Sequence, residues 1–281
     1  MERHATTRLT ALAGMILLLA ATATAQKPKA PENPYTEVTG ASGEIRNGAA
    51  KIKPAPRAAD GHPDLSGFWK GPLIFGGMFK DTGGKPPFTP AGEQAYQYNL
   101  TKSVNPEGLC IFAGLPRASI SGVPFEIVQN STRVAFLYEL MWTFRSIPVD
   151  GRQHPKDVEP SFWGNGIGKW EGDTLVIDSV GFKDKLTWLD DDAHPHSDAM
   201  HVVERWTRTD ADHLAHSVTI DDPKFYTKPF TFSRVFVAME PGQELYEMAC
   251  DENNIDRDGG HLGYGPLDLK SYPLNPKGKK K

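Results

Sequence analysis

The stretch Gly166-Ile-Gly-Lys-Trp-Glu-Gly-Asp-Thr-Leu-Val-Ile-Asp178 decides the class of fold. Its two β-prone runs, 166–170 and 174–178, are separated by the turn residues Glu171-Gly172-Asp173. Two such runs with a short glycine-containing connection are typical of a β-hairpin, in which the strands are antiparallel. The middle of the chain is therefore predicted to be antiparallel β-structure.

Alternating apolar and polar runs recur on both sides of this hairpin. We predict a short strand after the turn at 61–67 and further strands at residues 125–129, 133–139, 141–147, 200–208, 214–220, 230–237 and 245–250. Short connections favour antiparallel neighbours, and so many strands favour closure over an open sheet. The predicted fold is an all-β antiparallel barrel of the lipocalin or calycin type, with a two-sheet β-sandwich as the alternative.

One short helix is expected within this β-rich chain, from Pro90 to about Leu100. Thr89 suits the N-cap position, because its hydroxyl can accept a hydrogen bond from a backbone amide of the first turn. Proline is favoured at the first helical position, where its missing amide hydrogen is not needed.

Residues 1–25 have the organisation of an export signal. Arg3 and Arg8 form a positive segment, 9–21 is a short apolar run, and Ala23-Thr24-Ala25 is a small-x-small cleavage pattern. The apolar run is too short to cross a bilayer, which takes about 18 residues or more. We therefore expect a periplasmic protein without a membrane anchor.

The remaining chain is predicted to contain one folded domain. Residues 26–60 read as a flexible linker, 61–270 as a single β-rich domain and 271–281 as a basic tail. A net charge of −4 provides no basic field for nucleic acid. Cys110 and Cys250 either form a long-range disulfide, which an exported chain permits, or are two buried thiols. The sequence does not indicate an oligomeric state.

The segment Trp188-Leu-Asp-Asp-Asp-Ala-His-Pro-His-Ser-Asp-Ala-Met-His-Val-Val-Glu-Arg-Trp206 is dense in titratable groups. It holds three of the nine histidines and five acidic residues, which a packed core would not accommodate unpaired. Pro195 places its neighbours in a loop, and the strand that follows sends His201 and Glu204 to opposite faces. This segment is the predicted functional site.

The residue types in this segment suit acid–base catalysis. We predict His196 and His201 as base and acid, with Asp190 or Asp198 as the carboxylate that orients an imidazole. Arg145, on another strand, is predicted to hold an anionic or phenolic oxygen, because its guanidinium is always charged and offers several donors.

Aromatic and polar residues elsewhere are predicted to bind the substrate. Trp163 and Trp188 would line an apolar pocket for an aromatic ligand, with ordinary core packing as the alternative. His154, Tyr226 and Glu252 are predicted as further substrate contacts, with turn or rim positions as the alternative.

No organic cofactor is predicted. Imidazole nitrogens suit zinc and similar divalent ions, so His194, His196 and His201 are the candidate ligands if the segment holds a metal. Their spacing is that of neither a zinc finger nor a zinc protease motif, and we therefore favour acid–base chemistry.

Four motifs resemble a family of exported bacterial β-rich proteins: Pro63-Asp-Leu-Ser-Gly67, Trp170-Glu-Gly-Asp-Thr-Leu-Val176, Pro195-His-Ser-Asp-Ala-Met-His-Val-Val-Glu-Arg205 and Cys250-Asp-Glu-Asn-Asn254. The resemblance implies a link to bacteria that consume plant-derived aromatic compounds. It implies a lignin-derived phenolic dimer as substrate and a formaldehyde-releasing carbon–carbon lyase as activity. The family often has glutamate where this chain has Asp198, which shortens the reach of that carboxylate.

The leading hypothesis is a periplasmic enzyme that uses histidine and aspartate to cleave or rearrange a hydrophobic aromatic molecule in a β-barrel. For a hydroxymethyl substrate, the base would remove the alcohol proton while the acid assists departure of an oxygen on the adjacent carbon, which releases formaldehyde. The competing hypothesis is a periplasmic protein that binds a metal or an apolar ligand without catalysis.

Overall fold

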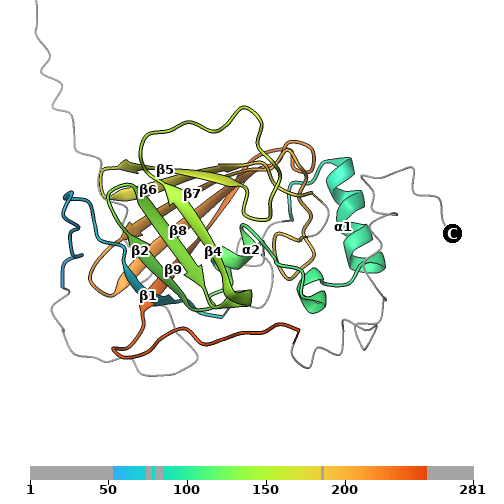
Figure 1. Ribbon diagram of the computed structural model, residues 1–281. Coiled ribbons are helices and arrows are strands. Elements are labelled where there is room, and N and C mark those ends of the chain that lie inside the picture. Colours follow the sequence, from blue (N-terminus) through green and yellow to red (C-terminus); the bar gives the residue numbers. More distant parts are fainter. Residues whose placement is uncertain (1–52, 74–77, 80–84, 185–186, 252–281) are drawn as a thin grey trace, which may run out of the picture. The chain divides into compact units, whose positions relative to one another are not determined.

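The structure, a computed structural model, describes residues 53–73, 78–79, 85–184 and 187–251 (Figure 1). The predicted export signal, most of the predicted linker, Glu252 and the basic tail lie outside the described residues. No helix among the described residues is long and apolar enough to cross a membrane.

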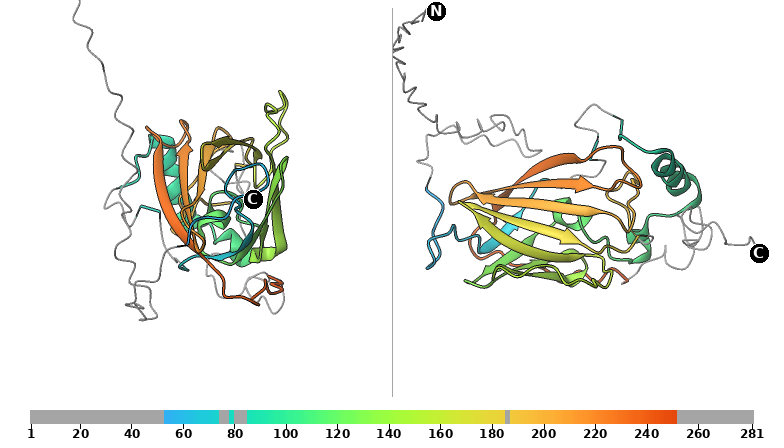
Figure 2. Two further views of the ribbon diagram at one scale, coloured as in Figure 1. Left: turned by 90° about the vertical axis from the view of Figure 1, so that its left-hand side faces the viewer. Right: turned by 90° about the horizontal axis from the view of Figure 1, so that it is seen from above.

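The described chain is built around one nine-stranded sheet in the order β4-β3-β2-β1-β9-β8-β7-β6-β5, with every neighbouring pair antiparallel. The strands are β1 (Gly67–Lys70), β2 (Phe125–Gln129), β3 (Arg133–Tyr138), β4 (Thr143–Pro148), β5 (Asn165–Glu171), β6 (Thr174–Val180), β7 (His201–Arg208), β8 (His213–Asp221) and β9 (Phe230–Ala238). The sheet curls into a nearly closed barrel (Figure 2), which confirms the predicted all-β barrel.

Glycines bring the two edge strands together. A side chain at Gly166 of β5 would come within 2.9 Å of Ile147 on β4, and one at Gly168 within 2.8 Å of Val149. The side chains of Ile147 and Val149 therefore pack directly on the backbone of β5. This packing closes the barrel, since among the described residues no strand ladder joins these two edges.

Along the strands, successive side chains point alternately into the barrel and toward its outer surface. On β7, Val202, Glu204 and Trp206 are fully buried, whereas His201 and Arg205 face outward. This alternation confirms the predicted faces of the strand. The buried apolar side chains form two clusters, and Trp163 packs against both.

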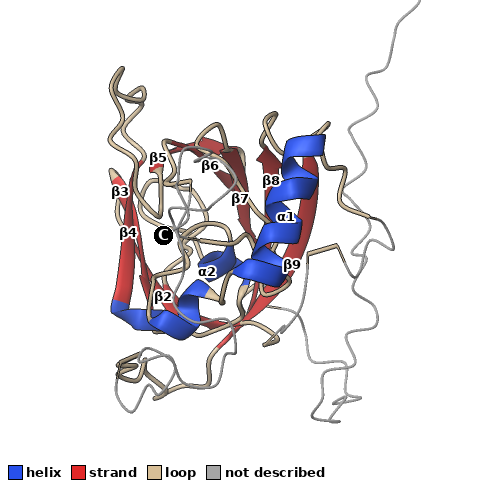
Figure 3. Cartoon of the chain, turned by 90° about the vertical axis from the view of Figure 1, so that its right-hand side faces the viewer, coloured by secondary structure: helices blue, strands red, loops and turns tan. Residues whose placement is uncertain are grey.

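Four short helical segments accompany the sheet in the described residues: α1 (Pro90–Lys102), η1 (Pro106–Leu109), α2 (Arg117–Ile120) and η2 (Leu140–Trp142). Helix α1 is the predicted helix, and the Thr89 hydroxyl accepts from Gly92 N at 3.1 Å as expected of an N-cap. It lies at one end of the barrel (Figure 3). Met141 and Trp142 belong to η2 rather than to the predicted strand, which starts at Thr143.

The predicted strand at residues 245–250 is wrong, because this segment is irregular and mostly exposed. Since β1 already pairs with the free side of β9, the returning chain finds no adjacent strand edge there. Cys110 and Cys250 form a disulfide, which confirms one of the two alternatives and fixes the end of the segment.

Candidate active site at the end of the barrel

A buried histidine–aspartate pair lies in the loop between β6 and β7. His194 Nδ1 is 2.7 Å from Asp190 Oδ2 and 2.8 Å from Oδ1, and the two residues are 4% and 3% exposed. The loop closes on itself where Leu189 N donates to His194 O at 2.8 Å. This short closure holds the imidazole over the carboxylate four residues earlier.

Three backbone amides also donate to Asp190. They belong to Met78, Asp192 and His194, at 2.9, 3.0 and 3.3 Å. Burial alone would raise the pKa of Asp190, but the hydrogen bonds from His194 and these amides hold the pKa below its ordinary value. The carboxylate is therefore ionised at neutral pH and requires a donor at His194 Nδ1.

This arrangement prepares the opposite nitrogen for chemistry. With its proton on Nδ1, a neutral imidazole offers a lone pair at Nε2, and an ionised carboxylate behind the ring stabilises the imidazolium that forms on protonation. His194 Nε2 has no hydrogen-bond partner among the described residues. The pair has the chemistry of a general base.

Aromatic rings enclose His194. Tyr96 of α1 stacks on the imidazole with the centroids 5.0 Å apart and the planes at 4°. Phe79 meets the ring edge-on at 4.8 Å, and Phe88 lies at 6.1 Å. Tyr226 packs on both phenylalanines, and its hydroxyl donates to Pro195 O at 2.8 Å. Such walls suit an aromatic ligand and exclude water.

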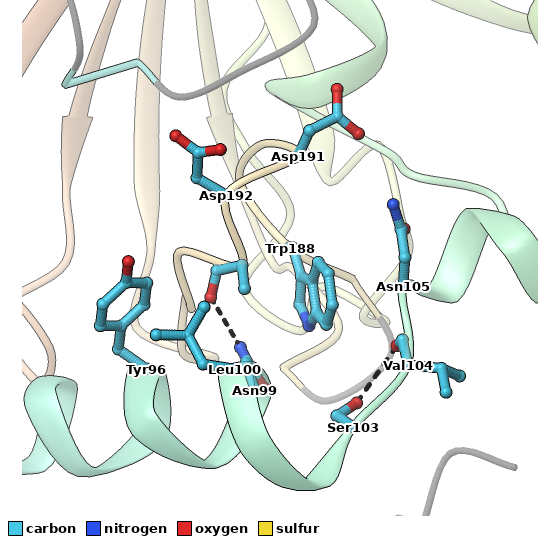
Figure 4. Close-up of a pocket in the computed structure, with 10 residues that line it drawn as sticks. Tyr96, Asn99, Leu100, Ser103, Val104, Asn105, Trp188, Asp191 and Asp192 are labelled. Carbon is cyan, nitrogen blue, oxygen red and sulfur yellow. Dashed lines mark hydrogen bonds between the residues drawn. The ribbon is translucent and has the colours of Figure 1, made fainter. Parts of the chain in front are cut away.

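A cavity of about 330 Å³ lies between α1 and the loop that carries the pair, and it is lined by residues next to Asp190 and His194 rather than by these two (Figure 4). Tyr96 connects the histidine–aspartate pair with the cavity, because its ring stacks on His194 and also lines the cavity. Other lining residues are Asn99, Leu100, Trp188, Asp191 and Asp192. Its volume lies at the small end of the range for small-molecule sites, roughly 300–1,000 Å³.

Of the sequence-predicted residues, Asp190 and Trp188 belong to this site, and His194 is its imidazole. His196 has another environment: it is buried, and its Nε2 lies 2.6 Å from the Thr187 hydroxyl. Burial lowers the pKa of His196, so its ring is neutral at neutral pH. Tyr226 lies in the aromatic wall rather than in the cavity lining.

His201 and His154 lie on the outer surface of the barrel. Both imidazoles donate to the carboxylate of Asp178, with His201 Nε2 2.8 Å from Oδ2 and His154 Nε2 2.8 Å from Oδ1. The side chains are 22% to 40% exposed. The structure therefore does not bring His201 together with His194 or His196.

Asp198 is exposed and forms an ion pair with Lys224. The nearby buried Asp222 stabilises the loop, because it accepts from Ser197 N at 2.6 Å and from the Ser197 hydroxyl at 2.7 Å. Among the described residues, no three histidine, cysteine, aspartate or glutamate side chains are grouped as metal ligands. The imidazoles of the predicted metal trio each contact a different partner.

Arg145 lies in the interior of the barrel, where sequence reasoning missed its partners. Its Nη2 donates to Glu204 Oε2 at 2.6 Å, and His216 Nε2 is 3.2 Å from Glu204 Oε1. Trp163 lies over the guanidinium at 5.0 Å, and Trp206 stacks on His216 at 3.6 Å. An acidic residue on the same face of β7 as the buried apolar residues was the sequence feature that could have predicted an internal ion pair.

No family model, curated protein or solved structure matches this chain. The resemblance to exported bacterial proteins stays a prediction. The candidate site is therefore identified from its geometry.

Proposed function

We propose that this protein is an enzyme in which the Asp190–His194 pair transfers a proton to and from a small aromatic molecule bound beside it. The observation that carries the proposal is the 2.7 Å contact from a buried, ionised aspartate to His194 Nδ1, which leaves Nε2 unpartnered among the described residues. Aromatic walls and the adjacent cavity supply the apolar environment.

Tyr96 supplies a second proton-transfer group at the same place. Burial, together with the charges of Asp192, Asp190 and Glu93, raises the pKa of Tyr96 above its ordinary value. The hydroxyl is therefore protonated at neutral pH and acts as a donor. His194 would be the base in place of His196, and Tyr96 the acid in place of His201.

The reaction class follows from these two roles and from the family resemblance, which favours lignin-derived phenolic dimers. His194 Nε2 takes the proton of a hydroxymethyl group, and the bond between that carbon and its neighbour breaks to release formaldehyde. The electron pair forms a carbon–carbon double bond, while the oxygen on the next carbon departs and takes a proton from Tyr96. The step is balanced without an oxidant or metal. Such an exported enzyme would act in the periplasm.

The test uses the mature protein with phenylcoumaran-type and diarylpropane-type dimers, and measures formaldehyde and the alkene product. We expect His194→Ala and Asp190→Asn to lose a factor of about 10² to 10⁴ in kcat. Asp178→Asn is the matched control, since Asp178 also binds imidazoles at 2.8 Å but on the outer surface. Full activity in His194→Ala would overturn the proposal.

A second candidate is a binding protein without catalysis, and one observation favours it. Three buried atoms inside the barrel, Trp206 Nε1, His216 Nδ1 and Ser179 Oγ, have no hydrogen-bond partner among the described residues. Unpartnered buried groups cost about 1–3 kcal/mol each, which a polar ligand that displaces the side chains around them would relieve. Ligand binding without turnover, weakened by Trp206→Phe, would favour this function.

A further inference from the structure

A second cavity, of about 710 Å³, lies where the turn between β3 and β4 meets the segment that leads to the disulfide. Its volume falls within the range for small-molecule sites, roughly 300–1,000 Å³. The described residues that line it come from three parts of the chain: Leu109 and Cys110, Met141 and Trp142, and residues 247–251. None of them lines the cavity beside α1, so this is a separate site.

The backbone of this second cavity is strained at three positions. Cys110, Met141 and Trp142 adopt left-handed φ angles of +57°, +53° and +51°. Only four residues other than glycine do so in the described chain, so most of them gather at this one site. Side chains with a Cβ disfavour this conformation, and residues held in it concentrate at ligand clamps and active sites. Trp142 is 64% exposed, so burial of its indole does not offset the strain.

Two links hold the outer wall of the cavity in place. Tyr246 N donates to Glu139 Oε2 at 2.9 Å, next to the turn that carries Trp142. The disulfide fixes the same segment at Cys250. The intervening residues 247–249 are therefore anchored at both ends. Such a preorganised wall lowers the cost of ordering the site when a ligand binds.

The charges and side chains of the lining favour a cation with an apolar body. Glu247 is an exposed carboxylate without an ion-pair partner among the described residues, whereas Asp251, which lines the cavity too, has a contact of its own. The described part of the lining contains no lysine, arginine or histidine. The face of an indole attracts a cation through its ring quadrupole. Met141 and Met248 add flexible thioethers, which adapt to irregular apolar groups.

We infer that this cavity binds an organic cation of the quaternary ammonium class, whose positive charge lies against the indole of Trp142 and near the carboxylate of Glu247. The methionines contact the apolar part of the ligand. The site goes beyond the proposed enzyme activity and does not depend on it, since the two cavities share no lining residue.

Three probes of one shape test the charge of the ligand. Calorimetric titration of the mature protein compares benzyltrimethylammonium with two carbon analogues, in which a quaternary carbon replaces the nitrogen and one methyl group becomes hydroxymethyl or carboxylate. We expect the cation to bind about fivefold to tenfold more tightly than the alcohol, because only the cation gains from the indole face and the nearby carboxylate. The carboxylate analogue should bind more weakly than the alcohol. Equal affinities for the cation and the alcohol would overturn the inference.

Two variants and two matched controls locate the binding groups. Trp142→Leu and Glu247→Gln should each lower the ratio of cation to alcohol affinity by about threefold. Phe144→Leu and Glu244→Gln change an exposed ring and an exposed carboxylate that do not line this cavity, and they should keep the ratio. Because the ratio compares two ligands in one protein, a loss of stability does not imitate the effect. A ratio that falls equally in variants and controls would overturn the assignment.

A second copy of the chain is the other candidate occupant, because Phe144 and Tyr246, close in sequence to the lining residues, add exposed aromatic surface. Sedimentation velocity at the protein concentrations of the titration distinguishes the two. We expect the same sedimentation coefficient for the natural protein and for Trp142→Leu. A dimer that Trp142→Leu dissociates would show that a second copy covers the cavity, and would overturn the inference.

Discussion

Arg145 and Glu204 form an ion pair inside the barrel, with Nη2 2.6 Å from Oε2 and side chains that are 2% and 0% exposed. Loss of one partner leaves the other charge buried and uncompensated, which costs about 3–5 kcal/mol. We predict that Glu204→Gln lowers the free energy of unfolding by this amount in urea titrations. Glu171→Gln, which removes an exposed carboxylate beside Arg205, is the control and should change it by less than about 1 kcal/mol.

The same pair makes stability depend on acid. Burial would raise the pKa of Glu204, but Arg145 and His216 lower it to about 2. Because the pKa of Glu204 is lower in the folded than in the unfolded protein, its ionisation stabilises the fold fully at pH values above the pKa of the unfolded chain, about 4.5. This stabilisation is lost as the pH falls from about 4.5 toward 2. We predict a steep fall of the melting temperature in this range that is shallower in Glu204→Gln. Parallel curves for the two proteins would contradict the assignment.

His196 is predicted to matter for stability and not for proton transfer. Its ring is buried and contacts the Thr187 hydroxyl at 2.6 Å, so His196→Ala leaves a cavity and an unpartnered hydroxyl. We expect the free energy of unfolding to fall by about 2–3 kcal/mol while the pH profile of kcat keeps its shape below the melting temperature. If the change of kcat on the basic side of the pH profile disappears in this variant, His196 takes part in the catalytic step.

The disulfide is predicted to be a major stabilising link, because Cys110 and Cys250 close a loop with a sequence separation of 140. Restriction of the unfolded chain by such a loop is worth about 4–5 kcal/mol. A reductant should lower the denaturation midpoint of the natural protein. The double variant Cys110→Ser, Cys250→Ser should have this lower midpoint without reductant, and added reductant should not change it. Two free thiols in the unreduced, oxidatively folded protein would contradict the link.

The barrel was predictable because strand alternation and turn chemistry are local properties. The hairpin at Gly172 and the buried face of β7 follow from neighbouring residues. The burial of a side chain and its contacts with distant parts of the chain are not local properties. Asp190 lies 112 residues from Met78, whose amide it accepts, and Glu204 lies 59 residues from Arg145. The sequence therefore indicated the loop that holds a buried histidine–aspartate pair, but not that His194, rather than His196, contacts the carboxylate.

The wrong prediction of a strand at 245–250 shows the same limit of local sequence patterns. Its alternation satisfied the local criterion, yet a strand also requires an open edge, and β9 is paired on both sides. Whether an edge is open depends on the register and order of strands far away in the chain.

The placement of α1 provides the last prediction, because this helix carries Tyr96 and Asn99 into the site. Gly92 permits its close approach: a Cβ there would lie 2.1 Å from the carbonyl oxygen of Phe225. We expect Gly92→Ala to displace the helix and to lower kcat/KM for the aromatic dimers at least tenfold.

The control separates displacement from lost stability. Gly172, in the turn between β5 and β6, has φ +60° and nothing within 4 Å of a Cβ, so Gly172→Ala costs only the backbone strain of roughly 1 kcal/mol. This variant should melt at a lower temperature but turn over the dimers as the natural protein does, because its strain lies in the turn and not against α1. Equal kcat/KM values for both variants would show that the site does not depend on the contact between Gly92 and Phe225.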